Sequence, residues 1–178
     1  MKWHKINVPL SLQDIHRLSC GDKVLLNGYV YTARDMAHRR FFTALQKNKK
    51  LPISIKGEVI YYVGPTPAPR GRIIGACGPT TSSRMDSFTP MLLKSGLKGM
   101  IGKGERSIET VRAIKKYKAI YFVTVGGAGA YLAGCVAEAR VIAYPDLGPE
   151  AIFRLKIRDL PVIVAIDSRG MDIFKRKK

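Results

Sequence analysis

The sequence predicts an α/β fold, in which strands and helices form layers around one core. Two observations favour this class: short runs rich in β-branched residues recur along the chain, and segments with helical spacing of apolar residues lie between them. A chain of 178 residues with 46% apolar composition buries one good core, so we expect a single domain over 1–178. We divide this domain into an irregular N-terminal arm (1–22), a main body (23–174) and a basic tail (175–178).

The first half of the chain alternates strands with one clear helix. The expected elements are a strand at 22–32 with a glycine irregularity, a helix at 34–49, a strand at 58–63, a rigid proline-rich loop at 64–71 and a strand at 72–76. Asp35 is a plausible first-turn or cap residue of the helix, which leaves Arg34 on the loop before it.

The second half continues the alternation with shorter elements. They begin with a helix that has Thr89 as its N-cap and Pro90 at its first position and that stops at Gly96, and with a short strand within 99–104 that ends in Lys103. A helix at 108–117 capped by Ser107, a strand at 119–125, a glycine turn with a short helix, an apolar run at 136–143, an alternating strand at 151–157 and a buried strand at 162–166 follow. Residues 120–137 carry no charge, but four glycines and a β-rich start favour a strand, a turn and a helix over a membrane span.

The chain is strongly basic, with 31 Lys and Arg against 13 Asp and Glu, a formal net charge of +18. Three partners are compatible with this excess: nucleic acid, an acidic partner subunit or anionic substrates. The sequence contains no aromatic-plus-basic motif of the known RNA-binding modules.

The three cysteines, Cys20, Cys77 and Cys135, have neither an even count nor paired spacing. This pattern argues against a disulfide framework and favours a reducing cytoplasm, and no apolar signal segment follows the first residues. We expect buried, inert thiols, because no CxxC-type loop for an iron–sulfur cluster is present.

The stretch 75–86 is the centre of the sequence. Gly78 and Pro79 end the preceding strand, and four hydroxyl residues then lead to Arg84. Hydroxyls and backbone N–H groups at a helix start, with an arginine in its first turns, predict an anion site. A capped helix after a tight turn explains the same residues without a ligand.

Other motifs are weaker. Gly127 and Gly129 imitate a dinucleotide fingerprint that fails at Leu132, so a close-packed turn is expected there. The Gly-Lys-Gly at 102–104 is not a P-loop, although its lysine can approach a ligand closely. His38 is expected on the helix surface rather than as a base, and no metal-ligand spacing occurs.

What remains is a cationic set on loops, Arg34, Arg84 and Lys103, together with Thr80. Such a set would hold a small di- or tricarboxylate and stabilise charge that develops on it. It would form only half of an active site, because nothing here supplies an electrophile.

These motifs, in this order, resemble the β subunit of class I iron–sulfur fumarate hydratases and L-tartrate dehydratases, or the C-terminal domain of single-chain members. The resemblance covers residues 10–174. Its main motifs are Arg-Asp-Met-Ala-His at 34–38, Gly-Pro-Thr-Thr-Ser-Ser-Arg-Met-Asp at 78–86 and Gly-Lys-Gly at 102–104, with supporting stretches at 61–65, 126–130 and 167–170.

The resemblance implies a swivelling β/β/α domain over 23–174, similar to the mobile domain of aconitases. It also implies an α subunit that holds a four-iron–four-sulfur cluster through three cysteines of its own, in an α2β2 complex. Cys20, Cys77 and Cys135 are therefore not assigned as metal ligands, and this chain alone is expected to bind no cofactor.

By the same resemblance, Arg34, Arg84 and Lys103 bind substrate carboxylates and Thr80 is the base that removes the C3 proton of malate. The supporting candidates are Asp35, His38 and Thr81. The implied reaction is the hydration of fumarate to L-malate, with dehydration of tartrate to oxaloacetate as the close alternative. A basic module that binds nucleic acid or an acidic protein is the alternative from another class.

Overall fold

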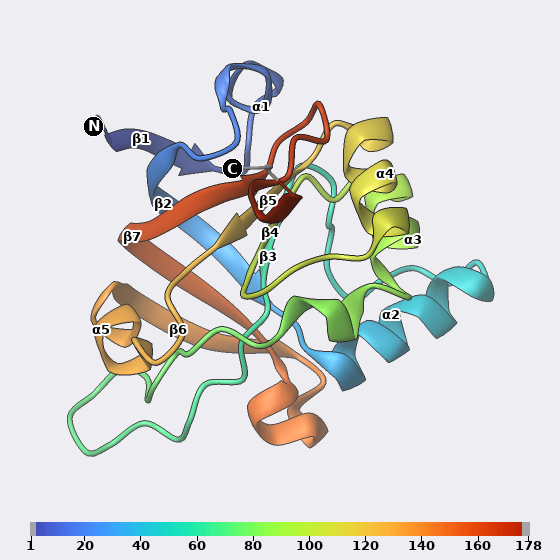
Figure 1. The fold of residues 1–178 in the computed structure, drawn as a ribbon. Helices are drawn as coiled ribbons and strands as arrows, with labels where there is room; N and C mark the ends of the chain where they lie inside the picture. The colour runs from blue at the N-terminus through green and yellow to red at the C-terminus, as the bar shows by residue number, and fades with distance from the viewer. Residues whose placement is uncertain (1–2, 176–178) are drawn as a thin grey trace.

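The computed structural model describes residues 3–175 and shows an α/β fold around a seven-stranded mixed sheet (Figure 1). The strands are β1 (Trp3–Val8), β2 (Lys23–Thr32), β3 (Val59–Tyr61), β4 (Gly99–Gly102), β5 (Ile120–Val123), β6 (Val136–Ala143) and β7 (Ile152–Ile166). The helices are α1 (Leu12–Arg17), α2 (Asp35–Gln46), α3 (Thr89–Lys94), α4 (Ile108–Tyr117) and α5 (Gly129–Gly134), with 3₁₀ turns η1 (Ser82–Met85), η2 (Pro145–Glu150) and η3 (Ile173–Lys175).

The first five strands run parallel in the order of the chain, from β1 to β5. The long strand β7 is antiparallel to β5, to β2 and to β6. Because β7 pairs with both β5 and β2, the sheet closes on itself from β2 to β7. The parallel strands therefore present all their carboxyl ends at one edge of a closed sheet.

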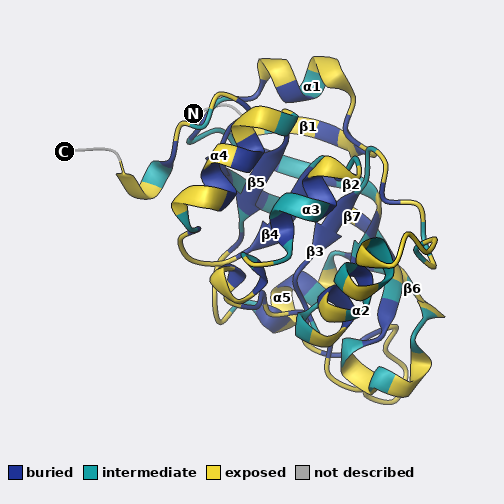
Figure 2. Ribbon diagram, turned by 90° about the vertical axis from the view of Figure 1, so that its right-hand side faces the viewer, coloured by how far each residue is buried: buried dark blue, intermediate teal, exposed yellow. Residues whose placement is uncertain are grey.

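Alternation along the strands separates two apolar cores. On β3 and just after it, Val59, Tyr61 and Val63 belong to one core, and Ile60 and Tyr62 belong to the other. The second core lies between the sheet and α2, α3 and α4, which cover one face together (Figure 2). Crossover helices on one face are expected when consecutive strands are parallel.

The predicted irregular arm over 1–22 is wrong, because its described part contains β1 and α1. Strand β1 pairs with β2 in parallel from Trp3 opposite Lys23 to Val8 opposite Gly28. The side chain of Ser11 caps α1 by accepting from the backbone N–H of Asp14.

The predicted strand at 72–76 is also wrong. This segment forms no strand. Its backbone is hydrogen-bonded to Thr66 instead: Thr66 N–H donates to the Ala76 carbonyl, and Ala76 N–H donates to Thr66 Oγ1. Proline-rich residues on the other side of this contact cannot supply a regular ladder of donors. The segment 64–76 is therefore a folded loop that pairs with itself.

Two further boundaries differ from the sequence predictions. Thr89 is not the N-cap of α3 but lies inside it, and its hydroxyl donates to the Met85 carbonyl. The strands expected at 151–157 and 162–166 form one strand, β7, which continues through Pro161. By contrast, the Ser107 cap of α4 is confirmed, since its hydroxyl accepts from Thr110 N–H at 3.2 Å.

The uncharged stretch 120–137 forms β5, a glycine turn, α5 and the start of β6, in agreement with the prediction. Among the described helices, none is long and apolar enough to cross a membrane. Of the predicted basic tail, Lys175 ends η3 and residues 176–178 lie outside the described part.

The pairing of β1 with β2 predicts a strict requirement for glycine at position 28. Gly28 has φ +113°, and a Cβ added there would lie 2.5 Å from the Val8 carbonyl oxygen. Gly28→Ala should lower the free energy of unfolding by about 1–3 kcal/mol in urea titrations. Gly134→Ala is the matched control, because a Cβ there meets nothing within 4 Å. Equal stability of the two variants would contradict this register.

Candidate functional site

The sequence-predicted site residues lie at the carboxyl edge of the parallel strands. Arg34 follows β2 as the N-cap of α2, and Lys103 directly follows β4. Thr80 joins this edge through its backbone N–H, which donates to the carbonyl of Tyr62 just beyond β3 at 2.6 Å. In sheets with parallel strands this edge is where ligands bind.

Two arginines and two carboxylates form one chain of ion pairs at this edge. The Nε and Nη2 atoms of Arg84 donate to the two Asp35 carboxylate oxygens at 2.8 Å each. Asp35 Oδ2 also lies 3.8 Å from Arg34 Nε, and Glu150 Oε1 lies 3.6 Å from Arg34 Nη2. The buried Nε of Arg34 has no hydrogen-bond partner among the described residues. Arg34 is thus surrounded by negative charge and still able to donate.

Thr80, Thr81 and Lys103 form a second group that is held through the backbone. Lys103 N–H donates to the Thr80 carbonyl at 3.3 Å, and Ser82 N–H donates to the Lys103 carbonyl at 2.9 Å. The Thr80 side chain is nearly buried, whereas Thr81 and Lys103 are exposed. The exposed Lys103 is thus joined through its backbone to the nearly buried Thr80.

A buried ion pair anchors the loop that carries Thr80 and Arg84. Arg106 Nε donates to Asp86 Oδ1 at 2.6 Å, and its Nη2 donates to Thr89 Oγ1 at 2.9 Å. The second oxygen of Asp86 accepts from Ser107 N–H at 2.7 Å. Arg106 is 4% exposed and stacks over Tyr121, with its guanidinium carbon 4.8 Å from the ring centroid. Its role was not predicted, because an arginine beside a helix cap gives no local sign of burial.

Ser82 adds a second anchor below the same loop. The hydroxyl of Tyr121 lies 2.8 Å from both Ser82 Oγ and the Gly104 carbonyl oxygen. A Cβ added to Gly102 would lie 1.9 Å from Ser82 Oγ, so only glycine fits beneath it. The glycines around Lys103 thus allow the motif loop to lie close to the end of β4.

The helix expected after the hydroxyl residues is only a four-residue 3₁₀ turn, η1. Its N-cap Thr81 makes no side-chain capping bond, so neither the capped helix nor the helix-start anion site is observed. A single turn aligns few peptide dipoles, and its field is correspondingly weak. Binding of an anion here therefore depends on the cationic side chains.

His38 is not on the helix surface, as the sequence suggested, but is fully buried. Its Nδ1 lies 2.9 Å from the Arg34 carbonyl oxygen, to which it donates, and the ring of Tyr62 contacts it edge-on. Burial lowers the pKa of His38 to about 4, so the imidazole is neutral at physiological pH. His38 consequently fixes the backbone of Arg34 and carries no charge.

The three cysteines differ in burial. Cys20 and Cys77 are buried, and burial raises the pKa of the Cys77 thiol to about 11. Cys135 is only partly buried, which differs from the expectation for it. The predicted close-packed turn is confirmed at Gly129, where an added Cβ would lie 3.1 Å from Gly78 N.

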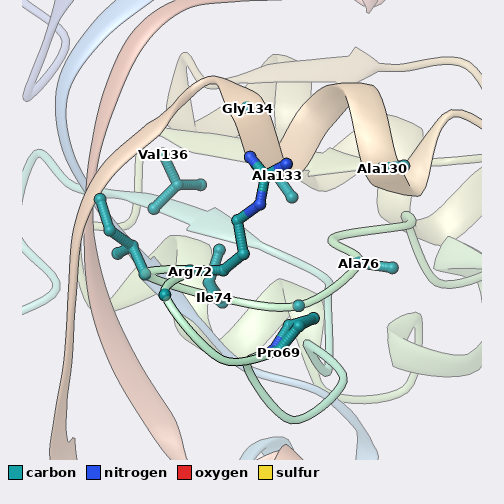
Figure 3. A pocket seen from close by; sticks show the side chains of 11 residues that line it. Pro69, Arg72, Ile74, Ala76, Ala130, Ala133, Gly134 and Val136 are labelled. Carbon is teal, nitrogen blue, oxygen red and sulfur yellow. The ribbon is translucent and has the colours of Figure 1, made fainter.

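Two hollows of about 450 and 480 Å³ lie beside the loop 64–76 rather than at the cationic edge. In the first, Arg72 extends across the space toward Ala133 and Gly134 of α5 (Figure 3). Neither hollow is lined by the predicted site residues. The cationic side chains lie instead at the ends of the parallel strands, where guanidinium and ammonium groups are suited to bind carboxylates.

Comparisons with known proteins give a matching family and relatives whose names agree with it. Residues 2–177 match the family described as Fumarase C-terminus. The aerobic class I fumarate hydratase of Salmonella typhimurium is 35% identical over 175 residues, which cover 96% of this chain and 30% of that protein. A Methanocaldococcus jannaschii protein named as a candidate L(+)-tartrate dehydratase subunit beta is 35% identical over 172 residues, 93% of this chain and 88% of its own length. The chain thus spans less than a third of the first relative and most of the second.

The buried imidazole predicts a pH dependence of stability. Because the pKa of His38 is about 4 in the folded chain and about 6.5 when unfolded, the unfolded chain takes up the proton first as pH falls. The free energy of unfolding should lose about 3 kcal/mol between pH 6.5 and 4 through this residue.

His38→Gln should flatten that part of the stability curve, measured by urea unfolding at several pH values. His16→Gln, on the exposed side of α1, is the matched control. Parallel curves for the wild type and His38→Gln would contradict the buried neutral state.

Proposed function

Because the chain belongs to the family described as Fumarase C-terminus, we propose that it is the carboxylate-binding part of a hydro-lyase that interconverts fumarate and L-malate. The observation that carries this proposal is the convergence of Arg34, Arg84 and Lys103 at one strand edge. Fumarate is a dianion, and two guanidinium groups with an ammonium group suit its two carboxylates.

The iron–sulfur cluster of class I enzymes does not fit the part of this chain that the structure describes. No group of three or more His, Cys, Asp or Glu side chains in residues 3–175 could hold a metal ion. Cys77 in particular is buried, and its Sγ donates to the Gly75 carbonyl oxygen at 3.4 Å. We therefore propose that a partner holds the four-iron–four-sulfur cluster.

In the proposed reaction, Arg34, Arg84 and Lys103 fix the substrate by its carboxylates. Removal of the proton at C3 of malate places negative charge on the adjacent carboxylate. A cation that already contacts this carboxylate stabilises the charge as it forms, without reorganising water. Arg84 and Lys103 are suited to this role, because both side chains are exposed at the edge.

We propose Thr80 as the base that removes this proton. Its hydroxyl is a weak base in water and needs a nearby cation and shielding from solvent to act. The shielding has support, because Thr80 is 9% exposed. The cation would come from Lys103, whose backbone N–H donates to the Thr80 carbonyl and makes the two residues neighbours. Asp35 orients Arg84, His38 fixes the backbone of Arg34, and Thr81 lies exposed beside Thr80.

The partner is proposed to be an iron–sulfur α subunit, in an α2β2 complex located in the cytoplasm. The match to 88% of a relative named as a subunit beta supports a companion subunit for this chain. We also propose that this domain swivels against the companion, as the mobile domain of aconitases does. Such movement would cover and uncover the cationic edge as substrate enters and product leaves.

Tartrate dehydration is the second candidate. The relative named as a tartrate dehydratase subunit matches this chain over 88% of its length at 35% identity, equal to the identity with the fumarate hydratase of Salmonella. Tartrate differs from malate by one hydroxyl, so the same cations would hold it. Anaerobic assays of the assembled enzyme with fumarate and with L(+)-tartrate distinguish the two.

The arginines should be essential in the assembled enzyme. Arg84→Ala and Arg34→Ala should each lower kcat/KM on the preferred substrate by more than about 100-fold, because a charged hydrogen bond to the substrate is lost. The ion pair of Arg84 is half exposed and contributes little to stability, so the fold should persist. Arg140→Ala, on the exposed face of β6, is the matched control. Unchanged kinetics in the first two variants would reject the site.

Thr80 should affect turnover more than binding. Thr80→Val keeps the volume of the side chain and removes the hydroxyl, so kcat should fall by about 100-fold or more with little change in KM. Thr80→Ser keeps a hydroxyl and should retain most of the activity. If Thr80→Val raises KM alone, the threonine binds substrate and another group is the base.

A further inference from the structure

Glu150 lies at the end of the η2 turn, 114 residues from the helix that it contacts. Its Oε2 accepts from the backbone N–H of Met36 at 2.9 Å, and its Oε1 lies 3.6 Å from Arg34 Nη2. One carboxylate thus contacts both the first turn of α2 and the side chain that precedes it.

The contact with Met36 replaces a missing cap. The N-cap of α2 is Arg34, which makes no side-chain capping bond, so the first N–H groups of the helix lack local acceptors. A carboxylate at a helix N-terminus satisfies such a donor and is stabilised by the helix dipole. This bond fixes Glu150, and its second oxygen is thereby held next to the guanidinium group of Arg34.

The side chain of Arg34 also lies against Gly64, close to the same turn. A Cβ added to Gly64 would lie 2.7 Å from Arg34 Nη1, 2.9 Å from its Cδ and 3.1 Å from the Pro149 carbonyl oxygen. A side chain at position 64 would therefore displace Arg34, and the Pro149 carbonyl of the η2 turn approaches the same point. Few rotamers of a long side chain are compatible with such close contact.

The η2 turn has its own anchor, which does not involve Glu150. The guanidinium group of Arg40 donates to both oxygens of Asp146, at 2.9 and 2.5 Å, and lies over the ring of Tyr144 at 4.8 Å from its centroid. Tyr144 and Leu147 also pack against the second core, so the contacts of the turn with α2 and the core do not depend on Glu150 alone.

We propose that Glu150 is a positioning residue for Arg34, which it holds in the orientation that binds a substrate carboxylate. This inference rests on the proposed function. The distance of 3.6 Å between the groups is too long for a hydrogen bond, so Glu150 attracts the guanidinium group without using its donors. Arg34 keeps those donors for the substrate and loses less conformational entropy on binding, because its side chain is already held.

The test is a double-mutant cycle in the enzyme assembled with its iron–sulfur part. Glu150→Gln removes the charge but keeps an oxygen that can accept from Met36 N–H, so thermal stability should stay close to that of the wild type. In the Arg34-containing enzyme it should lower kcat/KM by about tenfold, mainly through KM. In the Arg34→Ala background it should change kcat/KM by less than about twofold, because nothing remains to be positioned.

Binding of succinate, a dicarboxylate that cannot be dehydrated, gives a readout independent of turnover. Its Kd, measured by calorimetry, should rise about tenfold in Glu150→Gln and should not rise further when Arg34→Ala is already present. Glu138→Gln is the matched control, since Glu138 pairs with Lys156 on the exposed surface of β6 and β7. It should leave both quantities unchanged.

The outcomes separate the two levels of the proposal. If Arg34→Ala leaves kcat/KM and the succinate Kd unchanged, the carboxylate site itself is wrong. If Arg34→Ala lowers kcat/KM strongly but Glu150→Gln leaves it unchanged, Glu150 does not act through Arg34 and this inference is overturned. The same holds if Glu150→Gln lowers kcat/KM by the same factor with and without Arg34.

Discussion

The buried pair of Asp86 and Arg106 is the interaction on which the candidate site depends. Arg106 is enclosed by Tyr62 and Tyr121 and bonded to Asp86 and Thr89, so it joins the motif loop, α3 and the start of α4 in one contact set. Breaking such a buried pair typically costs 3–5 kcal/mol, because one charge is left without a partner. Thr80 and Arg84 lie on this loop, and their positions relative to the strand edge follow from it.

At this edge, positive and negative side chains follow one another in a fixed order. Two of the few carboxylates of the chain, Asp35 and Glu150, alternate with Arg84 and Arg34 rather than meeting surface lysines. Each carboxylate lowers the local positive charge but also restricts the conformations of an arginine side chain. Charges held in place stabilise a developing anion better than mobile ones. The edge therefore combines attraction for dicarboxylates with a fixed geometry.

Local signals predicted much of this structure, and long-range contacts account for what they missed. The helix α2, the Ser107 cap and the succession of β5, turn and α5 follow from spacing, capping residues and glycines within a few positions. The motifs that carry the family resemblance are local as well. Strand β1 was missed because its signal is a pairing with β2, and no pattern inside 3–8 reveals a partner twenty residues later.

The same reason applies to the site. Arg106 and Glu150 are ordinary charged residues in the sequence, and their roles arise from contacts with residues 20 and 114 positions away. His38 was placed on the helix surface because two arginines follow it, yet its face of α2 is turned toward Tyr62.

Strand β7 has a consequence for how the chain reaches this structure. Residues of β7 pair with β2 across more than 120 positions, for example Leu155 with Val30. Such distant pairing is slow to form, because a large loop must close before the contact is gained. During synthesis, the edges of β2 and β5 that pair with β7 therefore stay unpaired until β7 has left the ribosome. Unpaired strand edges of this kind are prone to aggregation, so this interval is when the nascent chain most needs a chaperone.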